Sequence, residues 1–374
     1  MKILHLGKFC PPNEGGIEVF SFDLLEALNK KGVKADLLCF DKQTNEDVYK
    51  GFKYFACKTN ILLNSAPISY DYTKTFLKIY KAYDIIHVHA PNPLAEILSL
   101  VANKRIIIHW HSDIVKQKIA YMFYRPIQQR IIQKSERVIV TSPQYLETSS
   151  QLKNYKDKAV VIPLGLNPAR LKIDEEDIKK FKEIRNKIKN KKVVLAIGRL
   201  VEYKGFVYLI ESAKFLRDDI VVLITGGGPL YNFLKNKIKS LGLENKVFLL
   251  GRVNINTVPV FIKNCDLFCL PSITRNESFG LSLVEALYFG KPLVTTDVEG
   301  SGMSYVNIHN QTGLVVPSKN PIALAEAINK ILSNEKLRNV FSRNALERFK
   351  EFRIDSVAGK IINLYEKILN KNNR

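Results

Sequence analysis

Short apolar runs alternate with longer amphipathic stretches along almost the whole chain of 374 residues. The runs are rich in Val, Ile and Leu, which is typical of strands that are buried on both faces of a parallel sheet. The stretches between them repeat their apolar residues at helical spacing. We expect strands at residues 2–7, 35–40, 84–89, 105–110, 137–141 and 159–162, and again at 193–198, 220–225, 247–250, 266–270 and 293–296. This alternation predicts an α/β protein with parallel sheets covered by helices.

The two series of strands are separated by a charged connector at residues 174–192. A chain of this length is too long for one ordinary hydrophobic core. We therefore predict two Rossmann-like domains, residues 1–168 and residues 169–353, that face each other across a cleft.

The formal net charge is +21, from 57 Lys and Arg and 36 Asp and Glu residues. Such an excess attracts polyanions, which include nucleotide phosphates, an anionic membrane and nucleic acid. The sequence has no zinc-finger spacing, aromatic RNA-binding signature or long basic block, so we expect no nucleic-acid partner. A Lys-rich, solvated surface explains part of the excess equally well.

No apolar run approaches the roughly 18 residues of a membrane-spanning helix, and the apolar start of the chain is too short for a signal peptide. The five cysteines form no Cys-x-x-Cys pair, which favours buried free thiols over a disulfide framework or a zinc site. These features predict a protein of the reducing cytoplasm.

The stretch from Asn276 to Leu287 places Glu277 and Glu285 around a turn that leads into a helix. It follows an apolar run, so we expect it at the carboxyl end of a strand, where open α/β sheets bind ligands. Backbone N–H groups at the helix N-terminus, near Gly280, favour an anion such as phosphate. The two carboxylates can accept hydrogen bonds from ligand hydroxyl groups. A helix with one capping and one surface glutamate is the alternative, and this stretch alone does not exclude it.

Three further turns follow strands of the same half. Arg199 and Lys204 occupy the first turn, and two fixed cations beside a helix N-terminus suit a diphosphate. Gly226 begins a Gly-Gly-Gly-Pro turn after the second strand, and Arg252 follows the third. Four such turns in one domain predict a nucleotide site.

Gly15 and Gly16 follow the first strand of the chain, but not in the Gly-x-Gly-x-x-Gly spacing of a dinucleotide site. Two interpretations remain open. The pair either lets the backbone approach a ligand across the cleft or forms a plain turn.

Four histidines occupy alternate positions at two strand ends of the first half: His87, His89, His109 and His111. Their spacing allows a metal site, but a mixture of structural and polar-contact roles is the preferred interpretation. His111 opens a loop directly after a strand and is the functional candidate of the four.

Residues 114–134 form a helical stretch that combines basic with aromatic residues. Its basic residues are Lys116, Lys118, Arg125, Arg130 and Lys134. Such a segment can lie on an anionic bilayer. The alternative is an ordinary surface helix whose apolar stripe packs into the core.

Taken together, these motifs resemble those of the family 4 glycosyltransferases, which have the GT-B fold of two facing Rossmann-like domains. The resemblance covers nearly the whole chain. It rests on Gly15-Gly16, His111, Gly198-Arg199 with Lys204-Gly205, Gly226-Gly227-Gly228-Pro229 and, above all, Glu277-Ser278-Phe279-Gly280 with Glu285. It implies a retaining transferase with a nucleotide-sugar donor in the C-terminal domain. It also implies that a last helix, at about residues 354–374, returns to the N-terminal domain.

The resemblance further implies the role of each site residue. Arg199 and Lys204 would hold the diphosphate, Glu285 the ribose hydroxyls and Glu277 the donor sugar, and His111 would close over that sugar. Backbone groups of Phe279, Gly280 and Leu281 would contact sugar and phosphate, and Gly15, Gly16, Gly226 and Arg252 complete the expected donor site. The catalytic candidates are His111, Glu277, Arg199 and Lys204. We expect no metal and no cofactor, because the sequence lacks an Asp-x-Asp motif and two cations can stabilise the leaving diphosphate.

Residues 111–118, together with Tyr124-Arg125-Pro126, are similar to bacterial mannosyltransferases that build surface polysaccharides such as lipopolysaccharide on a polyprenyl-diphosphate carrier. This similarity implies GDP-mannose as the donor and a glycan or polyprenyl-diphosphate-linked acceptor. It also implies peripheral association with the inner face of the cell membrane. UDP-glucose, UDP-galactose and UDP-N-acetylglucosamine are alternative donors. A nucleotide-sugar 2-epimerase and a non-enzymatic basic binding module are alternative functions.

Overall fold

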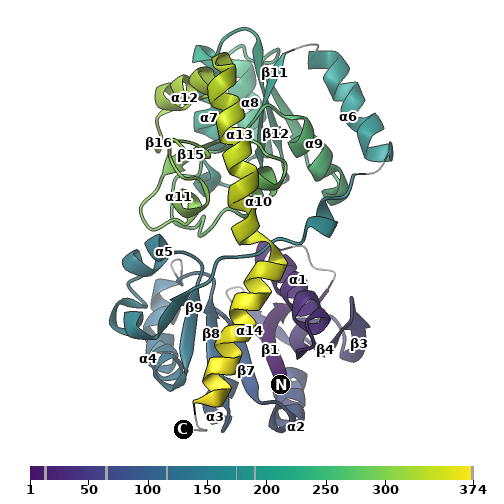
Figure 1. Ribbon diagram of the computed structural model, residues 1–374, viewed down its shortest axis with the longest axis vertical. Coiled ribbons are helices and arrows are strands. Elements are labelled where there is room, and N and C mark those ends of the chain that lie inside the picture. The colour runs from purple at the N-terminus through teal and green to yellow at the C-terminus, as the bar shows by residue number, and fades with distance from the viewer. Residues whose placement is uncertain (12–14, 64–65, 115–116, 174, 189–190, 372–374) are drawn as a thin grey trace. The chain divides into compact units, whose positions relative to one another are not determined.

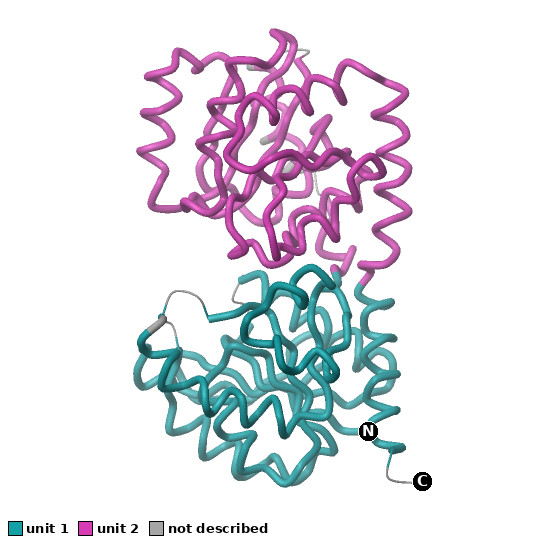
Figure 2. The backbone as a smooth tube through the Cα atoms, turned by 90° about the vertical axis from the view of Figure 1, so that its left-hand side faces the viewer, with its two compact units in different colours: residues 1–165, 354–374 teal, residues 166–353 magenta. Residues whose placement is uncertain are grey.

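The computed structural model (Figure 1) describes residues 1–11, 15–63, 66–114, 117–173, 175–188 and 191–371. The chain divides into two compact units, which Figure 2 distinguishes by colour. Unit 1 contains residues 1–165 and 354–374, and unit 2 contains residues 166–353. Each unit is built on one largely parallel sheet with helices, which confirms the predicted α/β class.

Unit 1 contains an eight-stranded sheet in the order β10-β9-β8-β7-β1-β2-β4-β3. Neighbouring strands are parallel, except that β3 pairs antiparallel with β4 at the edge. The strands are β1 (Lys2–Phe9), β2 (Lys34–Asp41), β3 (Asn45–Tyr49), β4 (Phe52–Lys58), β7 (Ile85–Ala90), β8 (Arg105–Trp110), β9 (Arg137–Val140) and β10 (Ala159–Val161), and a separate hairpin consists of β5 (Ile61–Leu63) and β6 (Ala66–Ile68). The strand order reverses between β1 and β7, so their carboxyl ends form the switch point of this sheet.

The helices of unit 1 cover both faces of its sheet. They are α1 (Gly16–Lys30), α2 (Tyr70–Ile79), α3 (Pro93–Val101), α4 (Lys118–Lys134), α5 (Pro143–Thr148) and α14 (Ile354–Asn370). Leu6, Val88 and Ile108 share one face and belong to an apolar core that includes residues of α2, α3 and α4. On the opposite face, Phe20 of α1 and Tyr365 of α14 contact histidine side chains of the strands. Among the described residues, no helix is both long and apolar enough to cross a membrane.

Unit 2 contains a six-stranded, fully parallel sheet in the order β13-β12-β11-β14-β15-β16. Its strands are β11 (Lys192–Ile197), β12 (Ile220–Thr225), β13 (Val247–Gly251), β14 (Leu267–Leu270), β15 (Leu293–Asp297) and β16 (Gly313–Pro317). This is the doubly wound order 3-2-1-4-5-6, in which the switch point lies between the first and fourth strands. The switch point of unit 2 is therefore between β11 and β14.

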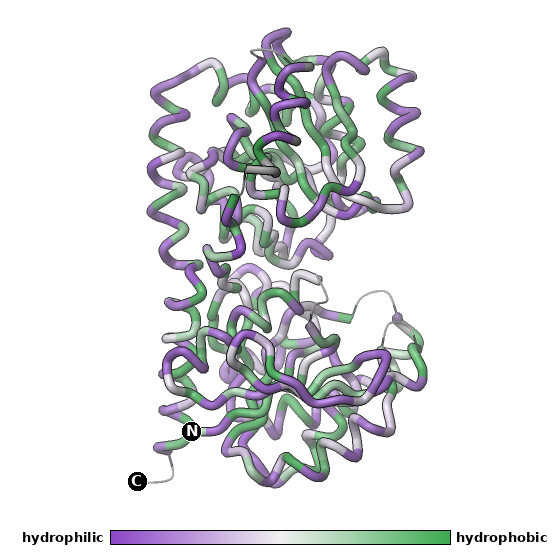
Figure 3. Tube along the Cα trace, turned by 90° about the vertical axis from the view of Figure 1, so that its right-hand side faces the viewer, coloured by the Kyte–Doolittle hydropathy of each residue, from purple (hydrophilic) through white to green (hydrophobic). Residues whose placement is uncertain are grey.

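The helices of unit 2 are α6 (Glu175–Ile188), α7 (Phe206–Ser212), α8 (Tyr231–Ser240), α9 (Val258–Asn264), α10 (Leu281–Tyr288), α11 (Met303–Val306), α12 (Pro321–Ser333) and α13 (Glu335–Phe349). Apolar residues of β11, β12, α7 and α12 form a common core. The central strands of the sheet are largely buried, and in Figure 3 the helices at the periphery alternate between hydrophobic and hydrophilic residues. This is the pattern on which the predicted strands and helices rest.

Some strands are present that the apolar runs did not predict. β16 extends the sheet of unit 2 beside β15. β3 consists mainly of exposed residues and exists through its pairing with β4. An exposed edge strand has no buried face, so its sequence carries no apolar alternation.

The prediction of five free thiols is wrong for two of the cysteines. Cys10, which follows β1, and Cys39 of β2 form a disulfide bond, because the parallel pairing of these strands brings their Cα atoms to 5.2 Å. Cys57, Cys265 and Cys269 are free and buried, as predicted.

Candidate functional site

The candidate site of unit 2 lies at its switch point, at the neighbouring carboxyl ends of β11 and β14. One connecting segment runs from Gly198 to Gly205 and the other from Pro271 to Gly280. A backbone hydrogen bond of 2.8 Å from Ile273 N–H to the Tyr203 carbonyl joins the two segments. Two stretches that are far apart in the sequence therefore form one edge, which is where a doubly wound sheet binds ligands.

Gly205 allows the two segments to touch. Its backbone is left-handed, with φ of 66°, and a Cβ at this position would lie 2.1 Å from the Pro271 carbonyl oxygen. Glycine is the residue that accepts both the conformation and the close approach. The preceding short helix (Glu202–Lys204) then directs Lys204 along the same edge.

Lys204 and Glu277 form a buried ion pair at this edge. The Lys204 Nζ lies 2.5 Å from a Glu277 carboxylate oxygen, and each side chain is only 11% exposed. The same oxygen accepts a hydrogen bond of 3.2 Å from the Ser272 hydroxyl. Burial by itself lowers the pKa of Lys204, but the Glu277 carboxylate and the Tyr203 hydroxyl outweigh it and raise this pKa. Lys204 is therefore a fixed ammonium group at physiological pH.

The glycine turn after β12 packs directly on the turn after β11. A Cβ on Gly226 would lie 1.8 Å from the Gly198 carbonyl oxygen, and one on Gly228 would lie 2.5 Å from the Leu200 carbonyl oxygen. Backbone bonds from Gly198 N–H to Thr225 and from Gly226 N–H to Gly251 link the turns of three neighbouring strands. The glycines thus serve the close packing of the turns that carry the site.

Arg199 and Arg252 lie on these turns with exposed side chains. Burial has the largest effect on the pKa of Tyr203 and raises it. The charge of Arg199 acts in the opposite direction, so Arg199 lies close to Tyr203. The side chain of Arg252 packs beside Gly227. Both arginines therefore belong to the strand ends on the β11, β12 and β13 side of the switch point.

Helix α10 begins directly after Gly280, as the sequence predicted. Gly280 is left-handed, with φ of 82°, and supplies no side-chain cap. The first N–H groups of a helix have no acceptor within that helix, so they can bind an anion. The Phe279 ring is buried and packs on Phe352, which leaves only its backbone for a ligand, and Leu281 is the first residue of the helix.

Glu285 lies on the second turn of α10. Burial raises the pKa of its carboxyl group to about 7, while Arg170 and Lys204 act in the opposite direction. The interaction with Lys204 places Glu285 in the same neighbourhood as the Lys204–Glu277 pair. At pH 7 the free protein thus holds this carboxyl group close to the midpoint of its titration.

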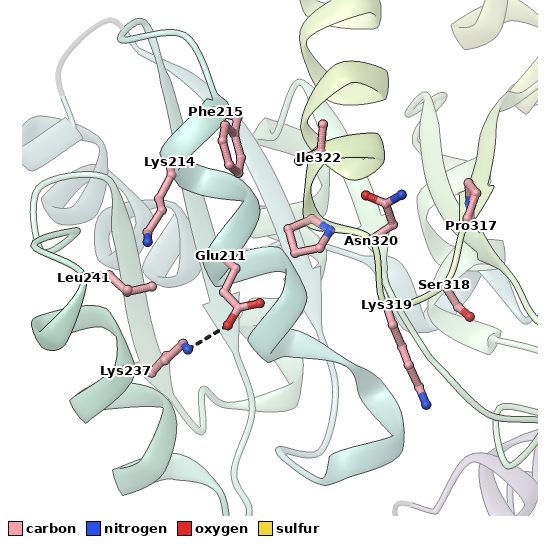
Figure 4. A pocket seen from close by; sticks show the side chains of 11 residues that line it. Glu211, Lys214, Phe215, Lys237, Leu241, Pro317, Ser318, Lys319, Asn320 and Ile322 are labelled. Atoms are coloured by element: carbon pink, nitrogen blue, oxygen red, sulfur yellow. Dashed lines mark ion pairs between the residues drawn. The ribbon is translucent and has the colours of Figure 1, made fainter.

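The surface hollow in Figure 4 is separate from these residues. It lies between α7, α8 and the loop that leads into α12, and its lining includes Glu211 and Lys237, which form an ion pair of 2.7 Å. None of the predicted site residues lines it. The candidate site residues of unit 2 therefore lie apart from this hollow.

The remaining candidates, Gly15, Gly16 and His111, belong to unit 1. Gly15 precedes α1, where a Cβ would meet the Glu18 carboxylate at 1.9 Å, whereas a Cβ on Gly16 would have open space. His111 follows β8, is buried, and its backbone N–H binds the Ala90 carbonyl. These positions lie at the carboxyl ends of β1 and β8. Val115 and Lys116 of the basic stretch lie outside the described residues.

His87, His89, His109 and His111 form a polar network that also includes His5, which the sequence analysis did not single out. The polar contacts that the preferred interpretation expects are therefore present. Ser272 and Tyr203 were not predicted either, although Ser272 follows a predicted strand end and Tyr203 precedes Lys204. Gly205 was named only as part of a family motif, without a structural role. No local sequence pattern predicted the role of Tyr365, because it is separated by 278 residues from His87, to which its hydroxyl group is hydrogen-bonded.

Comparisons with known proteins identify the family of this chain. Residues 14–170 match the model of Glycosyltransferase Family 4, and residues 177–348 match that of Glycosyl transferases group 1. An O-antigen chain mannosyltransferase C of Escherichia coli is 33% identical over 99% of both chains. The D-rhamnosyltransferase WbpZ of Pseudomonas aeruginosa is 30% identical over 94% of this chain and 92% of its own.

Among solved structures, Anabaena Alr3699/HepE in complex with UDP superposes with a TM-score of 0.80, 20% identity and coverage of 98% of this chain and all of its own. This likeness over both units confirms the GT-B fold. The matched family models and the full-length relatives establish that the chain belongs to glycosyltransferase family 4 and is a retaining GT-B enzyme.

Proposed function

We propose that this enzyme transfers mannose from GDP-mannose to a glycan or polyprenyl-diphosphate-linked acceptor during synthesis of a bacterial surface polysaccharide. Two relatives that match over nearly their whole length are named as an O-antigen mannosyltransferase and a D-rhamnosyltransferase. The observation that carries the donor site is the buried Lys204–Glu277 pair at the switch point of unit 2.

In this proposal the ion pair is the resting state of the donor site. The diphosphate takes Lys204 and Arg199 as its cations, and the Glu277 carboxylate accepts hydrogen bonds from hydroxyl groups of the sugar. Glu285 binds the ribose hydroxyls. Gly226 and Arg252, on the neighbouring turns, complete the pocket with the backbone of Phe279, Gly280 and Leu281. Gly15, Gly16 and His111 serve the sugar from unit 1.

The same groups account for catalysis. When the bond between sugar and phosphate breaks, negative charge grows on the leaving diphosphate. Two cations and the N–H groups at the start of α10 stabilise that charge where it develops, which is the largest kind of contribution a preorganised site makes. The cations would take the place of a divalent metal. Retention then proceeds by attack from the side of the leaving group, whose phosphate accepts the proton of the acceptor hydroxyl.

The test begins with donor binding. Thermal unfolding of the purified chain is measured with GDP-mannose, UDP-glucose, UDP-galactose and UDP-N-acetylglucosamine in turn. A ligand at 100 times its Kd stabilises the folded state by about 2.7 kcal/mol, so we expect GDP-mannose alone to raise the Tm by several degrees. Stabilisation by UDP-sugars alone would contradict GDP-mannose as the donor.

Turnover is then measured as release of nucleoside diphosphate, with and without an acceptor lipid and with and without EDTA. We expect release that requires the acceptor and survives EDTA. Loss of turnover that returns with Mg²⁺ would contradict the metal-free site. Conversion of the donor without an acceptor would favour a 2-epimerase.

We also propose that α4 places the enzyme on an anionic membrane surface. Ile119, Met122 and Phe123 are 78%, 62% and 73% exposed and lie on one helical face. Arg125 and Arg130 are exposed on the same helix. An exposed apolar stripe beside basic residues suits the interface of an anionic bilayer, and a lipid-linked acceptor would be found there.

A further inference from the structure

Five buried imidazoles and one phenol of unit 1 form a continuous chain of hydrogen bonds. The imidazoles project from β1, β7 and β8 toward α1 and α14, and none is more than 3% exposed. The phenol belongs to Tyr365 of α14. In order, the contacts are His111 Nε2 to His89 Nδ1 (3.0 Å), His89 Nε2 to His5 Nδ1 (3.0 Å), His5 Nε2 to Tyr365 Oη (3.3 Å), Tyr365 Oη to His87 Nδ1 (2.6 Å) and His87 Nε2 to His109 Nδ1 (3.3 Å).

The ring geometry supports these contacts. The His89 and His111 ring planes differ by 6° and their centroids are 5.3 Å apart, as expected for two imidazoles joined edge to edge by one N–H···N bond. Parallel strand pairing places His5 beside His87 and His89 beside His109. Because side chains alternate along a strand, all these rings emerge on one face of the sheet.

Each of the five imidazoles is neutral. Burial lowers their pKa values, and most are lowered further by neighbouring histidines; the pKa of His89 falls to about 3. A neutral imidazole has one N–H donor and one acceptor nitrogen. In an unbroken chain of such rings, the direction of one hydrogen bond therefore sets the direction of all the others.

Ser21 of α1 sets that direction. Its hydroxyl donates to the Ile17 carbonyl at 2.8 Å, so its oxygen can only accept from His89 Nδ1, which lies 3.3 Å away. His89 must then carry its proton on Nδ1 and also donates to His111 Nε2. His111, whose Nε2 accepts, must carry its own proton on Nδ1.

The rest of the chain follows in the same sense. His5 Nδ1 donates to His89, Tyr365 donates to His5, His87 Nδ1 donates to Tyr365, and His109 Nδ1 donates to His87. Within the described part of the chain, two buried ring nitrogens have no partner, His111 Nδ1 and His109 Nε2. One end is a donor and the other an acceptor, as a chain with one direction requires.

We propose that this chain fixes His111 as a neutral donor with its proton on Nδ1, and that Ser21 and His89 are the residues that position that proton. The N–H group would donate to an oxygen of the bound sugar or acceptor. His111 would therefore act as a hydrogen-bond donor and not as the base that deprotonates the acceptor. The tautomer follows from unit 1 alone, whereas the contact with a substrate rests on the proposed function.

A metal ion is the competing occupant of these histidines. Two groups of three, His5 with His87 and His89, and His89 with His109 and His111, have ring nitrogens within 4.8 Å of one another. A metal would need the lone pairs that the hydrogen bonds use. It would also place a divalent charge in a neutral, buried setting, which is costly without an anion. The two arrangements thus exclude each other.

The decisive measurement is the tautomer of each histidine, read from long-range ¹H–¹⁵N spectra of the full chain with labelled imidazoles at mildly alkaline pH. We expect the Nδ1–H form for all five buried histidines. His309 provides the internal control, because its Nδ1 accepts from Val315 N–H at 3.0 Å and its proton must lie on Nε2 when it is neutral. An Nε2–H signal for His111, or a stoichiometric metal found by elemental analysis, would overturn the proposal.

Two variants separate positioning from simple packing. Ser21→Ala removes the acceptor that sets the direction, so we expect His89 and His111 to show mixed or reversed tautomers, and Ser21→Thr to restore the Nδ1–H form. Tyr365→Phe interrupts the chain on the far side of His5, and we expect His111 to keep its Nδ1–H form. If Ser21→Ala leaves both tautomers unchanged, Ser21 is not the positioning residue.

Turnover tests the contact with substrate separately. The side-chain nitrogen of asparagine can occupy the place of Nδ1, and that of glutamine the place of Nε2. We expect His111→Gln and His111→Ala to lower kcat by about 10²-fold or more, as for loss of a donor at a reacting centre, and His111→Asn to retain about tenfold more activity than either. Glutamine as the better replacement would contradict the Nδ1 contact. The tautomers measured in the spectra do not depend on which donor the enzyme uses.

Discussion

Gly205 lies so close to Pro271 that a single added carbon would be 2.1 Å from the Pro271 carbonyl oxygen. This contact joins the segment that carries Lys204 to the end of β14, from which the Glu277 segment departs. The candidate site of unit 2 therefore depends on a backbone contact as much as on its charged side chains.

Gly205→Ala should lower the free energy of unfolding by about 3 kcal/mol or more, because it adds a steric clash to the cost of a left-handed alanine. It should also abolish donor binding. The matched control is Gly242→Ala, at φ of 65° with open space around it. The control should cost only about 1 kcal/mol, as measured by urea unfolding. An equal loss of unfolding free energy in the two variants would contradict the structural role of the contact between Gly205 and Pro271.

Lys204→Ala and Glu277→Ala should each destabilise the protein by about 3 kcal/mol, because each leaves a buried charge unpaired. The double variant should cost clearly less than the sum of the two. The pair Lys237 and Glu211 (Figure 4), whose side chains are 30% and 29% exposed, is the control, for which we expect a coupling of about 0.5 kcal/mol in the same double-mutant cycle.

Turnover should fall by at least about 10²-fold in both single variants of the Lys204–Glu277 pair, since the proposed function gives each residue its own role toward the donor. Restored turnover in the double variant would show that the pair serves only stability.

Glu285 should make stability fall as pH rises. Its pKa is raised from 4.5 to about 7, so the folded protein binds more protons than the unfolded chain between these values, and the free energy of unfolding decreases with pH in that range. Glu285→Gln removes this contribution. We expect the variant to match the wild type in Tm near pH 5 and to exceed it near pH 8. A Tm difference that is the same at both pH values would contradict this assignment.

Ionisation of Glu285, which lowers stability as pH rises, should strengthen donor binding over the same pH range. An ionised carboxylate is the stronger acceptor for ribose hydroxyls, so the affinity for a nucleotide-sugar should rise between pH 6 and pH 8. Glu285→Gln should bind more weakly and without this pH dependence, as titration calorimetry would show.

The double variant Met122→Asp/Phe123→Asp should reduce binding to phosphatidylglycerol vesicles by about tenfold or more. Binding of the wild type should weaken with salt, because part of it is electrostatic. Ile322→Asp, at another exposed apolar position on α12, should bind like the wild type in the same sedimentation assay. Loss of binding in that control would point to general damage and not to α4.

The parts of the site that follow strand ends could be predicted from the sequence. Lys204, Glu277 and Gly280 lie in the segments that follow apolar runs, and parallel strands bring their carboxyl ends to one edge. The direct ion pair between Lys204 and Glu277 could not be predicted, because it depends on how closely two loops pack at Gly205 and Pro271.

Contacts that depend on strand pairing across the sheet could not be predicted from the sequence either. Cys10 and Cys39 meet because β1 and β2 are neighbours with a particular register. His5 joins the other histidines because β1 lies beside β7. Neither the register nor the position of Tyr365 leaves a local pattern in the chain.

The composition of unit 1 from two separate segments has a consequence for its synthesis. Helix α14 leaves the ribosome after the whole of unit 2, yet Tyr365 provides the bond between His5 and His87. In a nascent chain that ends before α14, His5 Nε2 and His87 Nδ1 therefore lack the hydroxyl group that joins them in the complete unit. Unit 2 can fold as one uninterrupted stretch, whereas unit 1 begins first and is completed last.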